Sequence, residues 1–488
     1  MIPPRRSSHL VAASRVSAGA KGWPRDPLRL ALFALMLLTV SRIQEHFGVL
    51  SALRPALLLA GLACAYALLH PRSLAGTGWF RTWPAKVVVG FGIMACLSAV
   101  FGISLGASAR TILEDYSKVL IFGFLLMATI RRTEDLRAYV WAYVISGAVL
   151  VWLSLFVFGM DKAPPDGIAR LNFRYSYDAN DVGAVLLVAL GLALLTFHTS
   201  RRTGKLVSAA IILGIGVTLA KSGSRGALIG LVAALVALLV LVRRVSVVSR
   251  LAMAVVAITG LAVASPPGYW QQMKTILRPT EDYNWTTPGG RKEIWLRGLG
   301  YMTSYPLFGI GIGNFGRAEG TMSERARHWT PGQAGIKWSA PHNSFVEAGA
   351  ELGVPGLILW STLVLGGIVA MRRLRRRLPK SWAVGDPQQR FLYLGTSYLP
   401  VALSGFAAST FFVSFTFLDP SYILAAIMSG MYVCADRKLA ESQAMASLGR
   451  PYTARVLGIS PGTGGYAPRA FGWPGSGDSG HGPRRANS

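Results

Sequence analysis

The sequence predicts an all-α protein that crosses a membrane many times. Of its 488 residues, 52% are hydrophobic and only 15% are charged, whereas about a quarter of the residues of a typical soluble chain are charged. The apolar residues lie in long uninterrupted runs, and about 18 such residues suffice to cross the hydrocarbon core of a bilayer. Most runs are too long for barrel strands and do not alternate, so helices are the expected spanning elements.

Twelve apolar segments are expected to span the membrane, and the short first and modest ninth segments leave counts of eleven and thirteen open. They are 28–41, 55–69, 87–104, 116–130, 138–158, 179–197, 206–220, 226–242, 251–265, 353–371, 391–410 and 416–434. The chain then divides into a basic tail, nine helices, a large loop, three helices and a disordered Gly/Pro/Ser-rich tail. These parts are 1–27, 28–265, 266–352, 353–434 and 435–488.

The net charge of +28 is explained by topology. With the N-terminus placed inside, the cytoplasmic segments hold 31 of the 50 Lys and Arg residues and the short outer segments hold 8. This asymmetry is typical of membrane proteins, whose cytoplasmic loops are rich in Lys and Arg. We therefore expect both termini in the cytoplasm, the loop 266–352 outside, and no binding to nucleic acid. Because that loop is rich in aromatic residues and Ile, we expect it to pack rather than to remain disordered.

Four polar clusters lie on the expected outer face, and the first leads into the span 179–197. It contains Arg170, Arg174, Tyr175, Asp178, Asn180 and Asp181. Asp178 or Asn180 suits the cap of that helix, which is the purely structural interpretation of those two residues. Arginines beside a helix start also suit phosphate or acidic sugars.

The second cluster is the turn Lys221-Ser222-Gly223-Ser224-Arg225-Gly226 between two spans. Ser222 or Ser224 is expected to cap the helix that follows. Arg225 then lies at the positive end of that helix, where a cation is unfavourable unless an anion binds there. The alternative is an arginine that extends to the membrane interface.

The third cluster lies in the large loop, where Gly289 and Gly290 precede a helical pattern that carries Arg291, Lys292 and Trp295. The spacing predicts an amphipathic helix with its apolar side formed by Trp295, Leu299 and Met302, and with Glu293, Arg297 and Ser304 opposite. Arg291 lies in the first turn, so the arrangement of the second cluster recurs. The alternative is a solvated arginine beside a surface helix.

The fourth cluster is Pro341-His342-Asn343-Ser344-Phe345-Val346-Glu347, just before the span that begins at 353. Ser344 and Glu347 have the spacing of a capping box, which would explain Glu347 structurally. A neutral His342 at the outer mouth of that span could accept a proton from an acceptor hydroxyl. The alternative is a histidine hydrogen-bonded to the backbone.

Taken in order, these motifs resemble the O-antigen ligase and polymerase superfamily. The motifs are the Ser-Arg-Gly turn at 224–226, Arg291 ahead of a Trp-containing helix, Tyr-Pro-Leu-Phe-Gly-Ile-Gly-Ile-Gly-Asn-Phe at 305–315, and the segment 341–347. The resemblance covers about residues 170–360. It implies a GT-C-like helical fold in a bacterial inner membrane, with an active site on the periplasmic side and neither a metal nor another cofactor.

The resemblance also implies an activity, in which a glycan moves from an undecaprenyl-diphosphate carrier to an acceptor glycan or to lipid A–core. Arg225 and Arg291 match the diphosphate-binding arginines, and His342 matches the histidine that activates or positions the acceptor hydroxyl. We expect direct, inverting attack. Further residues are expected to bind substrate, namely Arg170, Arg174, Asp181, Lys221, Ser224, Lys292, Trp295, Asn343 and Glu347.

Several functions remain open at this point. A polymerase of surface-polysaccharide repeat units is preferred, because a genome commonly carries several polymerases and one ligase. The O-antigen ligase is the first alternative, and the resemblance implies a flippase and a chain-length regulator as further partners. A small-anion transporter, for example of bicarbonate, belongs to another class; it predicts ionisable residues near mid-membrane, whereas the charge here gathers at the outer face.

Overall fold

The fold is all-helical wherever the computed structural model describes the chain. The described residues are 26–74, 78–161, 169–171, 177–242, 245–278, 280, 285, 287, 289–330 and 338–448. Eight of their helices are long and apolar enough to cross a membrane, and two more, Pro27–Ser41 and Arg225–Leu241, are shorter apolar helices. The predicted all-α polytopic membrane fold is thus confirmed, while the count of twelve spans stays a prediction.

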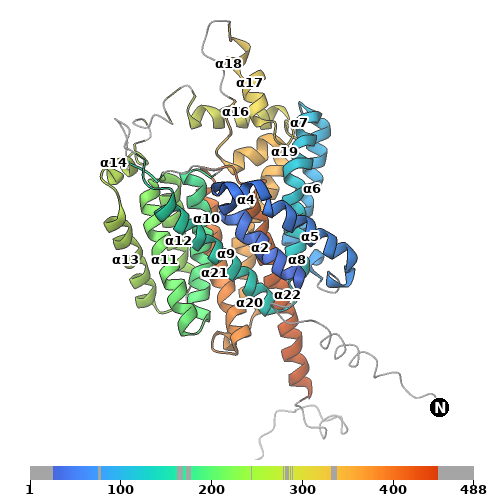
Figure 1. Ribbon diagram of the computed structural model, residues 1–488, viewed down its shortest axis with the longest axis vertical. Coiled ribbons are helices and arrows are strands. Elements are labelled where there is room, and N and C mark those ends of the chain that lie inside the picture. Colours follow the sequence, from blue (N-terminus) through green and yellow to red (C-terminus); the bar gives the residue numbers. More distant parts are fainter. Residues whose placement is uncertain are drawn as a thin grey trace, which may run out of the picture. The chain divides into compact units, whose positions relative to one another are not determined.

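The chain up to residue 157 supplies a first set of helices, of which α5, α6, α7 and α8 lie on one side of the bundle (Figure 1). They are α2 (Pro27–Ser41), α3 (Ile43–His46), α4 (Gly48–Leu53), α5 (Pro55–Leu69), α6 (Trp83–Phe101), α7 (Leu105–Thr111), α8 (Ser117–Thr129) and α9 (Thr133–Trp152). Two wider π turns, Ile112–Tyr116 and Leu153–Val157, join α7 to α8 and extend α9.

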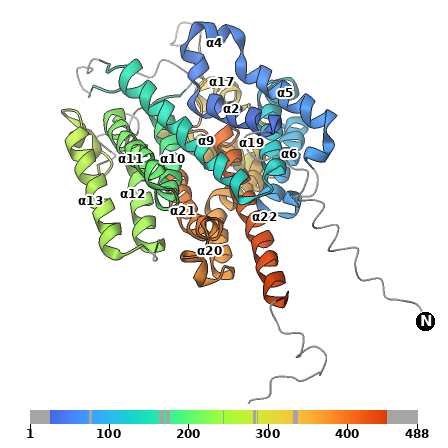
Figure 2. The same ribbon diagram turned by 60° about the horizontal axis from the view of Figure 1, so that its bottom comes forward.

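The chain from residue 179 onward supplies the central helices and the elements of the large loop. They are α10 (Ala179–Thr199), α11 (Arg202–Ser222), α12 (Arg225–Leu241), α13 (Val247–Ala264), α14 (Tyr269–Lys274), α16 (Arg291–Ser304), α17 (Phe315–Thr321), α18 (Glu324–Arg327), α19 (Ser344–Ser361), α20 (Gly367–Arg377), α21 (Pro387–Ser409) and α22 (Asp419–Leu448). Figure 2 shows α10 and α21 inside the bundle and α13 at its edge.

Small residues let the central helices approach one another closely. A Cβ atom placed on Gly191 of α10 would lie 2.6 Å from Cβ of Ala402 in α21, and one on Gly230 of α12 would lie 2.8 Å from the carbonyl oxygen of Gly405 in α21. Such contacts between small residues are the usual way for membrane helices to pack without a hydrophobic driving force. They hold α10 and α12 against the same helix, and the first residues of α10 and α12 therefore come together.

The large loop packs at one end of the bundle, which we call the loop end. Figure 1 shows α14, α16, α17 and α18 gathered there, with α19 beneath α16. A glycine-rich turn links α16 to α17, and its Gly309, Gly311 and Gly313 all have positive φ. The buried Glu351 fixes this turn, because its carboxylate accepts hydrogen bonds from the backbone N–H groups of Gly313 and Phe315. The loop is therefore ordered through its own helices where it is described.

Two expected boundaries differ from the structure. Helix α22 continues to Leu448, beyond the expected end at 434, because residues 435–448 are rich in helix-forming Ala, Leu, Glu, Gln, Lys and Met. Helix α19 begins at Ser344, inside the expected loop, and bends at Gly353, where φ is +73°. Residues up to Leu439 form one compact unit and those from Ala440 a second. The site described below lies in the first unit.

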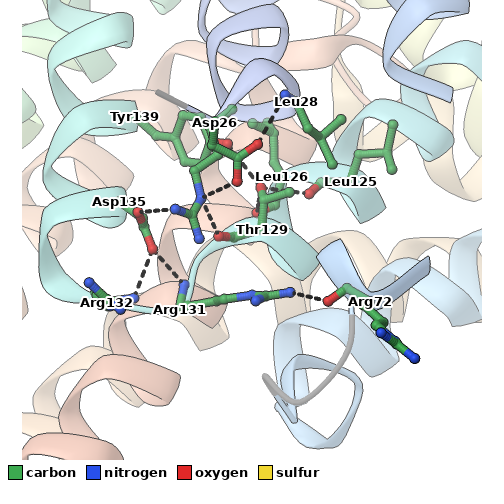
Figure 3. A network of polar contacts seen from close by, with 11 residues as sticks. Asp26, Leu28, Arg72, Leu125, Leu126, Thr129, Arg131, Arg132, Asp135 and Tyr139 are labelled. Carbon is green, nitrogen blue, oxygen red and sulfur yellow. Dashed lines mark hydrogen bonds and ion pairs between the residues drawn. The ribbon is translucent and has the colours of Figure 1, made fainter. Parts of the chain in front are cut away.

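A buried ion pair joins helices at the end of the bundle opposite the loop end. Arg29 of α2 lies 3.1 Å from the carboxylate of Asp135 in α9 and donates to the carbonyl oxygen of Thr129 at 3.3 Å. The same carboxylate accepts the backbone N–H groups of Arg131 and Arg132, each at 3.0 Å. Figure 3 shows this network joining α2, α8 and α9. The sequence places Arg29 inside a span, and its charge is neutralised there.

Candidate functional site

The first residues of three helices, α10, α12 and α16, surround one cavity at the loop end. We call this space the arginine cavity. Its volume is about 800 Å³. It is lined by Arg170, Asp178, Asn180, Gly223, Ser224, Arg225, Gly226, Ile229, Thr275, Ile276, Trp285, Arg291, Trp295, Ala408, Phe411 and Phe412. Five of the expected site residues are therefore brought together from distant parts of the chain: Arg170, Ser224, Arg225, Arg291 and Trp295.

The cap residues of α10 and α12 join the two helix starts. Asp178 caps α10 by accepting the backbone N–H groups of Asn180 at 2.6 Å and Asp181 at 2.9 Å. Ser224 caps α12 by accepting the backbone N–H of Ala227 at 3.0 Å, and its hydroxyl donates to Oδ1 of Asn180 at 2.6 Å. Helix N-termini carry partial positive charge, so both helices direct it toward the cavity.

Arg225 is the first residue of α12, and the segment after α13 fixes its direction. Its Nη1 donates to Oγ1 of Thr275 at 2.8 Å, and that hydroxyl donates to the carbonyl oxygen of Gln272 at 2.7 Å. The side chain of Gln272 in turn donates to the carbonyl oxygen of Gly223 at 3.3 Å. The guanidinium therefore lies at the cavity wall rather than extending along the membrane surface. The sequence did not single out Thr275, because the turn after α14 carries no motif.

Helix α16 supplies Arg291 at its first position and Trp295 one turn later. The indole Nε1 of Trp295 donates to the carbonyl oxygen of Pro341 at 2.9 Å. Its ring meets Trp285 edge-on, with centroids 5.8 Å apart, and lies 6.2 Å from the ring of Phe412. Arg291 and Trp295 thus reach one cavity from the same face of one helix. This spacing follows from the helical pattern in the sequence.

The buried face of α16 differs from the expected one. Ile294, Gly298 and Tyr301 are its buried residues, whereas Leu299 is 44% exposed. A Cβ atom on Gly298 would lie 2.3 Å from a side-chain methyl group of Val346, so this glycine allows α16 to pack closely on α19. The apolar side expected for this helix, formed by Trp295, Leu299 and Met302, is therefore not its buried side, and the contact of that expected side with the membrane surface stays a prediction.

His342 lies beside the arginine cavity but is not among its lining residues. It is half-buried and follows Pro341, the residue whose carbonyl oxygen holds Trp295. Its φ is +46°, a left-handed conformation that few residues other than glycine adopt. Such backbone conformations cost of order 1–3 kcal/mol and concentrate at functional sites. The surrounding structure must therefore hold this residue in place.

Asn343, rather than Ser344, caps helix α19, so the expected capping box is wrong. Oδ1 of Asn343 accepts the backbone N–H groups of Phe345 at 2.9 Å and Val346 at 3.2 Å. The hydroxyl of Ser344 instead donates to the carbonyl oxygen of Val413 at 2.7 Å. The cap of α19 is thus local, whereas the partner of Ser344 comes from a distant segment.

Glu347 and Ser344 attach helix α19 to the segment between α21 and α22. The carboxylate of Glu347 accepts the backbone N–H of Thr416 at 3.0 Å, and the backbone N–H of Ser344 donates to the carbonyl oxygen of Thr410 at 2.8 Å. This segment carries Phe411 and Phe412, which line the cavity. No sequence motif marked either phenylalanine.

Asp181, Lys221 and Lys292 are further expected site residues that the structure describes. The carboxylate of Asp181 accepts the backbone N–H of Asp178 at 3.0 Å and lies within electrostatic reach of Arg291 and Arg42. Lys221 is half-buried in the last turn of α11, and Lys292 is exposed. Neither lysine lines the arginine cavity. Arg174 lies outside the described residues.

Arg42 is a further cation near this site that no sequence motif marks. Its guanidinium carbon lies 4.8 Å from the ring centroid of Tyr177. Burial raises the pKa of Tyr177 to about 12, although the charge of Arg42 opposes the shift. The position of Arg42, directly after an apolar segment on the expected outer side, was the available signal.

The fold and the site define a polytopic membrane protein with a cationic cavity at the start of three helices. Residues 207–361 match the family model described as O-Antigen ligase. The resemblance seen in the sequence is thus confirmed for this part of the chain, which includes Ser224, Arg225, Arg291, Trp295 and His342. A search of curated proteins found no match to the chain.

Proposed function

We propose that this protein transfers a glycan from an undecaprenyl-diphosphate-linked donor to a sugar hydroxyl at the loop end, on the periplasmic side of a bacterial inner membrane. The observation that carries the proposal is the arginine cavity, where three helices begin and three arginines meet. Arg225 and Arg291 are each the first residue of a helix. A helix start with an arginine is a suitable binding site for phosphate groups.

The leaving diphosphate gains negative charge as the glycosidic bond breaks, and fixed positive charge lowers the energy of that transition state. Arg225 and Arg291 supply this charge, and Arg170 also lines the cavity. We propose that these arginines take the place of a divalent ion. In support, three arginines and one carboxylate, that of Asp178, line the cavity, so a metal cation would be repelled.

The cavity also has an apolar side, which suits the lipid part of such a donor. Ile229 of α12, Ala408 of α21, and Phe411 and Phe412 after α21 line it. Because α21 is long and apolar enough to span a membrane and α12 is an apolar helix packed on it, we expect this side to continue toward the hydrocarbon region. A ligand with an anionic head and a long apolar chain would find matching surfaces here.

His342 is proposed to accept the proton of the acceptor hydroxyl as that oxygen attacks the anomeric carbon. In support, it lies one residue from the carbonyl group that binds Trp295, a residue of the cavity wall. The attacking oxygen forms the new glycosidic bond while the bond to the diphosphate breaks, and the diphosphate leaves with its electron pair. A single direct displacement of this kind inverts the anomeric configuration.

The reaction preferred here is polymerisation of repeat units of a surface polysaccharide, and transfer of the chain to lipid A–core is the alternative. A deletion strain complemented with wild type, Arg291→Ala or His342→Ala distinguishes them. Single repeats on the carrier without polymer would identify a polymerase. Full-length polymer on the carrier with bare lipid A–core would identify a ligase. An unchanged profile, or rescue by both variants, would overturn the proposal and favour transport.

The matched control is Arg317→Ala. Arg317 is an exposed arginine of α17 in the same loop and lines neither the arginine cavity nor the second polar cavity of the loop end. This variant should restore the wild-type glycan profile. Activity of the purified protein should also survive EDTA, and loss on chelation with recovery on addition of a divalent ion would contradict arginine-based stabilisation.

A further inference from the structure

A second polar cavity lies on the other side of helix α16. Its volume is about 590 Å³. The side chains that matter most for its chemistry are Glu293, Arg297, Tyr301, Tyr305, Glu324 and Arg327. None of these lines the arginine cavity. We call this space the α16–α18 cavity, because α16 and α18 supply most of its polar groups.

One wall of this cavity is built on a buried carboxylate. Glu319 of α17 is 3% exposed, and it accepts three hydrogen bonds from Arg297, with Nε at 2.9 and 3.1 Å and Nη2 at 2.6 Å. The hydroxyl of Tyr301 donates to the same carboxylate at 2.9 Å. Burial and the neighbouring Glu319 charge raise the pKa of Tyr301, so its hydroxyl stays protonated. These bonds fix the direction of both side chains before any ligand arrives.

The fixed groups leave hydrogen-bonding capacity toward the cavity. The bonds recorded for Arg297 use Nε and Nη2, so its Nη1 can still donate. Glu293, Glu324 and Arg327 add charged groups at the rim, and Tyr305 adds a hydroxyl beside a flat ring. In the ranges that the structure describes, no side-chain hydrogen bond or ion pair is recorded for these four rim residues.

The charges of this cavity are nearly balanced, in contrast to those of the arginine cavity. Glu319 neutralises Arg297, and Glu293 and Glu324 stand against Arg327. A balanced set of donors and acceptors with tyrosine rings suits an uncharged ligand that carries many hydroxyl groups. A diphosphate would be repelled by the two rim carboxylates. The chemistry therefore fits a sugar chain.

We propose that the α16–α18 cavity binds an oligosaccharide segment of the glycan, while the arginine cavity holds the carrier diphosphate. The inference rests on the proposed function and assigns a separate site for the sugar units. Helix α16 connects the two, with Arg291 and Trp295 facing one cavity and Arg297 and Tyr301 facing the other. Its length would set the distance between the reacting end and the bound sugars.

The test uses the purified full chain and a lipid-free oligosaccharide of several repeats, released by mild acid from the surface polysaccharide of the source strain. Binding is measured by saturation-transfer NMR and by titration. We expect wild type to bind and Glu324→Ala/Arg327→Ala to bind about tenfold more weakly or worse, because each lost hydrogen bond to a charged group weakens binding. Arg317→Ala and Arg291→Ala should bind as wild type does.

Absence of binding to wild type, or equal binding by the rim variant, would overturn the inference. Failure of the two proposals is distinguishable, because the probe has no diphosphate. Normal polysaccharide in Arg291→Ala cells together with weakened binding in the rim variant would reject the proposed function and support this site. Tighter binding of longer fragments would identify the growing chain as the ligand, and equal binding of a single repeat would identify the donor unit.

Discussion

Arg29 and the three arginines of the arginine cavity lie at opposite ends of this bundle, and their surroundings differ. Arg29 is buried between the carboxylates of Asp26 and Asp135, at 3.7 and 3.1 Å. In the arginine cavity, three arginines and one aspartate line about 800 Å³ of space. An enclosed arginine whose charge is balanced by neighbouring carboxylates holds helices together. Arginines that outnumber the carboxylates around a cavity can bind an anion.

The largest effect on stability is expected at the end of the bundle where Arg29 pairs with Asp135. Arg29→Met leaves Asp135 as an uncompensated buried charge and should lower the free energy of unfolding by about 3–5 kcal/mol. Thermal unfolding of the detergent-purified protein measures the loss. The double variant Arg29→Met/Asp135→Asn should recover part of it, because no lone charge then remains buried. Equal stability of wild type and Arg29→Met would show that this pair is not structural.

At the cavity end the expected effect falls on activity instead. Arg291→Ala should reduce glycan transfer about 10²–10³-fold, as does loss of one group that stabilises a developing oxyanion. Thermal unfolding should change little, and Arg291→Lys should restore only part of the rate, because lysine lacks the planar bidentate fork. The assay follows transfer from purified carrier-linked donor. A loss of stability in Arg291→Ala as large as that in Arg29→Met would contradict the prediction that Arg291 serves activity rather than stability.

His342→Asn separates chemistry from backbone conformation. Asparagine tolerates a positive φ such as the +46° of residue 342 but cannot act as a base near neutral pH. We expect a folded protein whose transfer rate falls about 10²-fold or more. His342→Ala should lose the same activity and also some stability. Full activity of His342→Asn would assign the histidine a structural role.

A smaller effect is expected at Glu319, the buried carboxylate behind the α16–α18 cavity. Glu319→Gln removes the charge that Arg297 faces and weakens its hydrogen bond to Tyr301, which should cost about 1–3 kcal/mol. Hydrogen exchange of α17 amides should rise, because this carboxylate joins α17 to α16. Glu324→Gln is the control, since Glu324 is exposed. Unchanged exchange in Glu319→Gln would mean that apolar contacts, such as that between the rings of Tyr301 and Phe315, hold α17 on α16 without this carboxylate.

Much of the fold and part of the site could be predicted because they depend on local sequence. Each expected span overlaps a helix, since burial of apolar residues in lipid acts on every segment separately. Ser224 caps α12 and Arg291 opens α16, as the neighbouring serine and glycine residues indicate. That Arg225 and Arg291 share one cavity also agrees with the resemblance, although neither spacing nor composition requires it.

The features of the fold and the site that could not be predicted depend on contacts between distant segments. Ile294, Gly298 and Tyr301 became the buried face of α16 because Val346 and Phe315 approach that side. Glu347 binds the backbone of Thr416, although its spacing from Ser344 indicated a local cap. The sequence by itself determined where helices begin and how apolar they are, because these are properties of single segments. Only the tertiary structure decided which polar groups meet, because a hydrogen bond needs both partners within about 3 Å of each other.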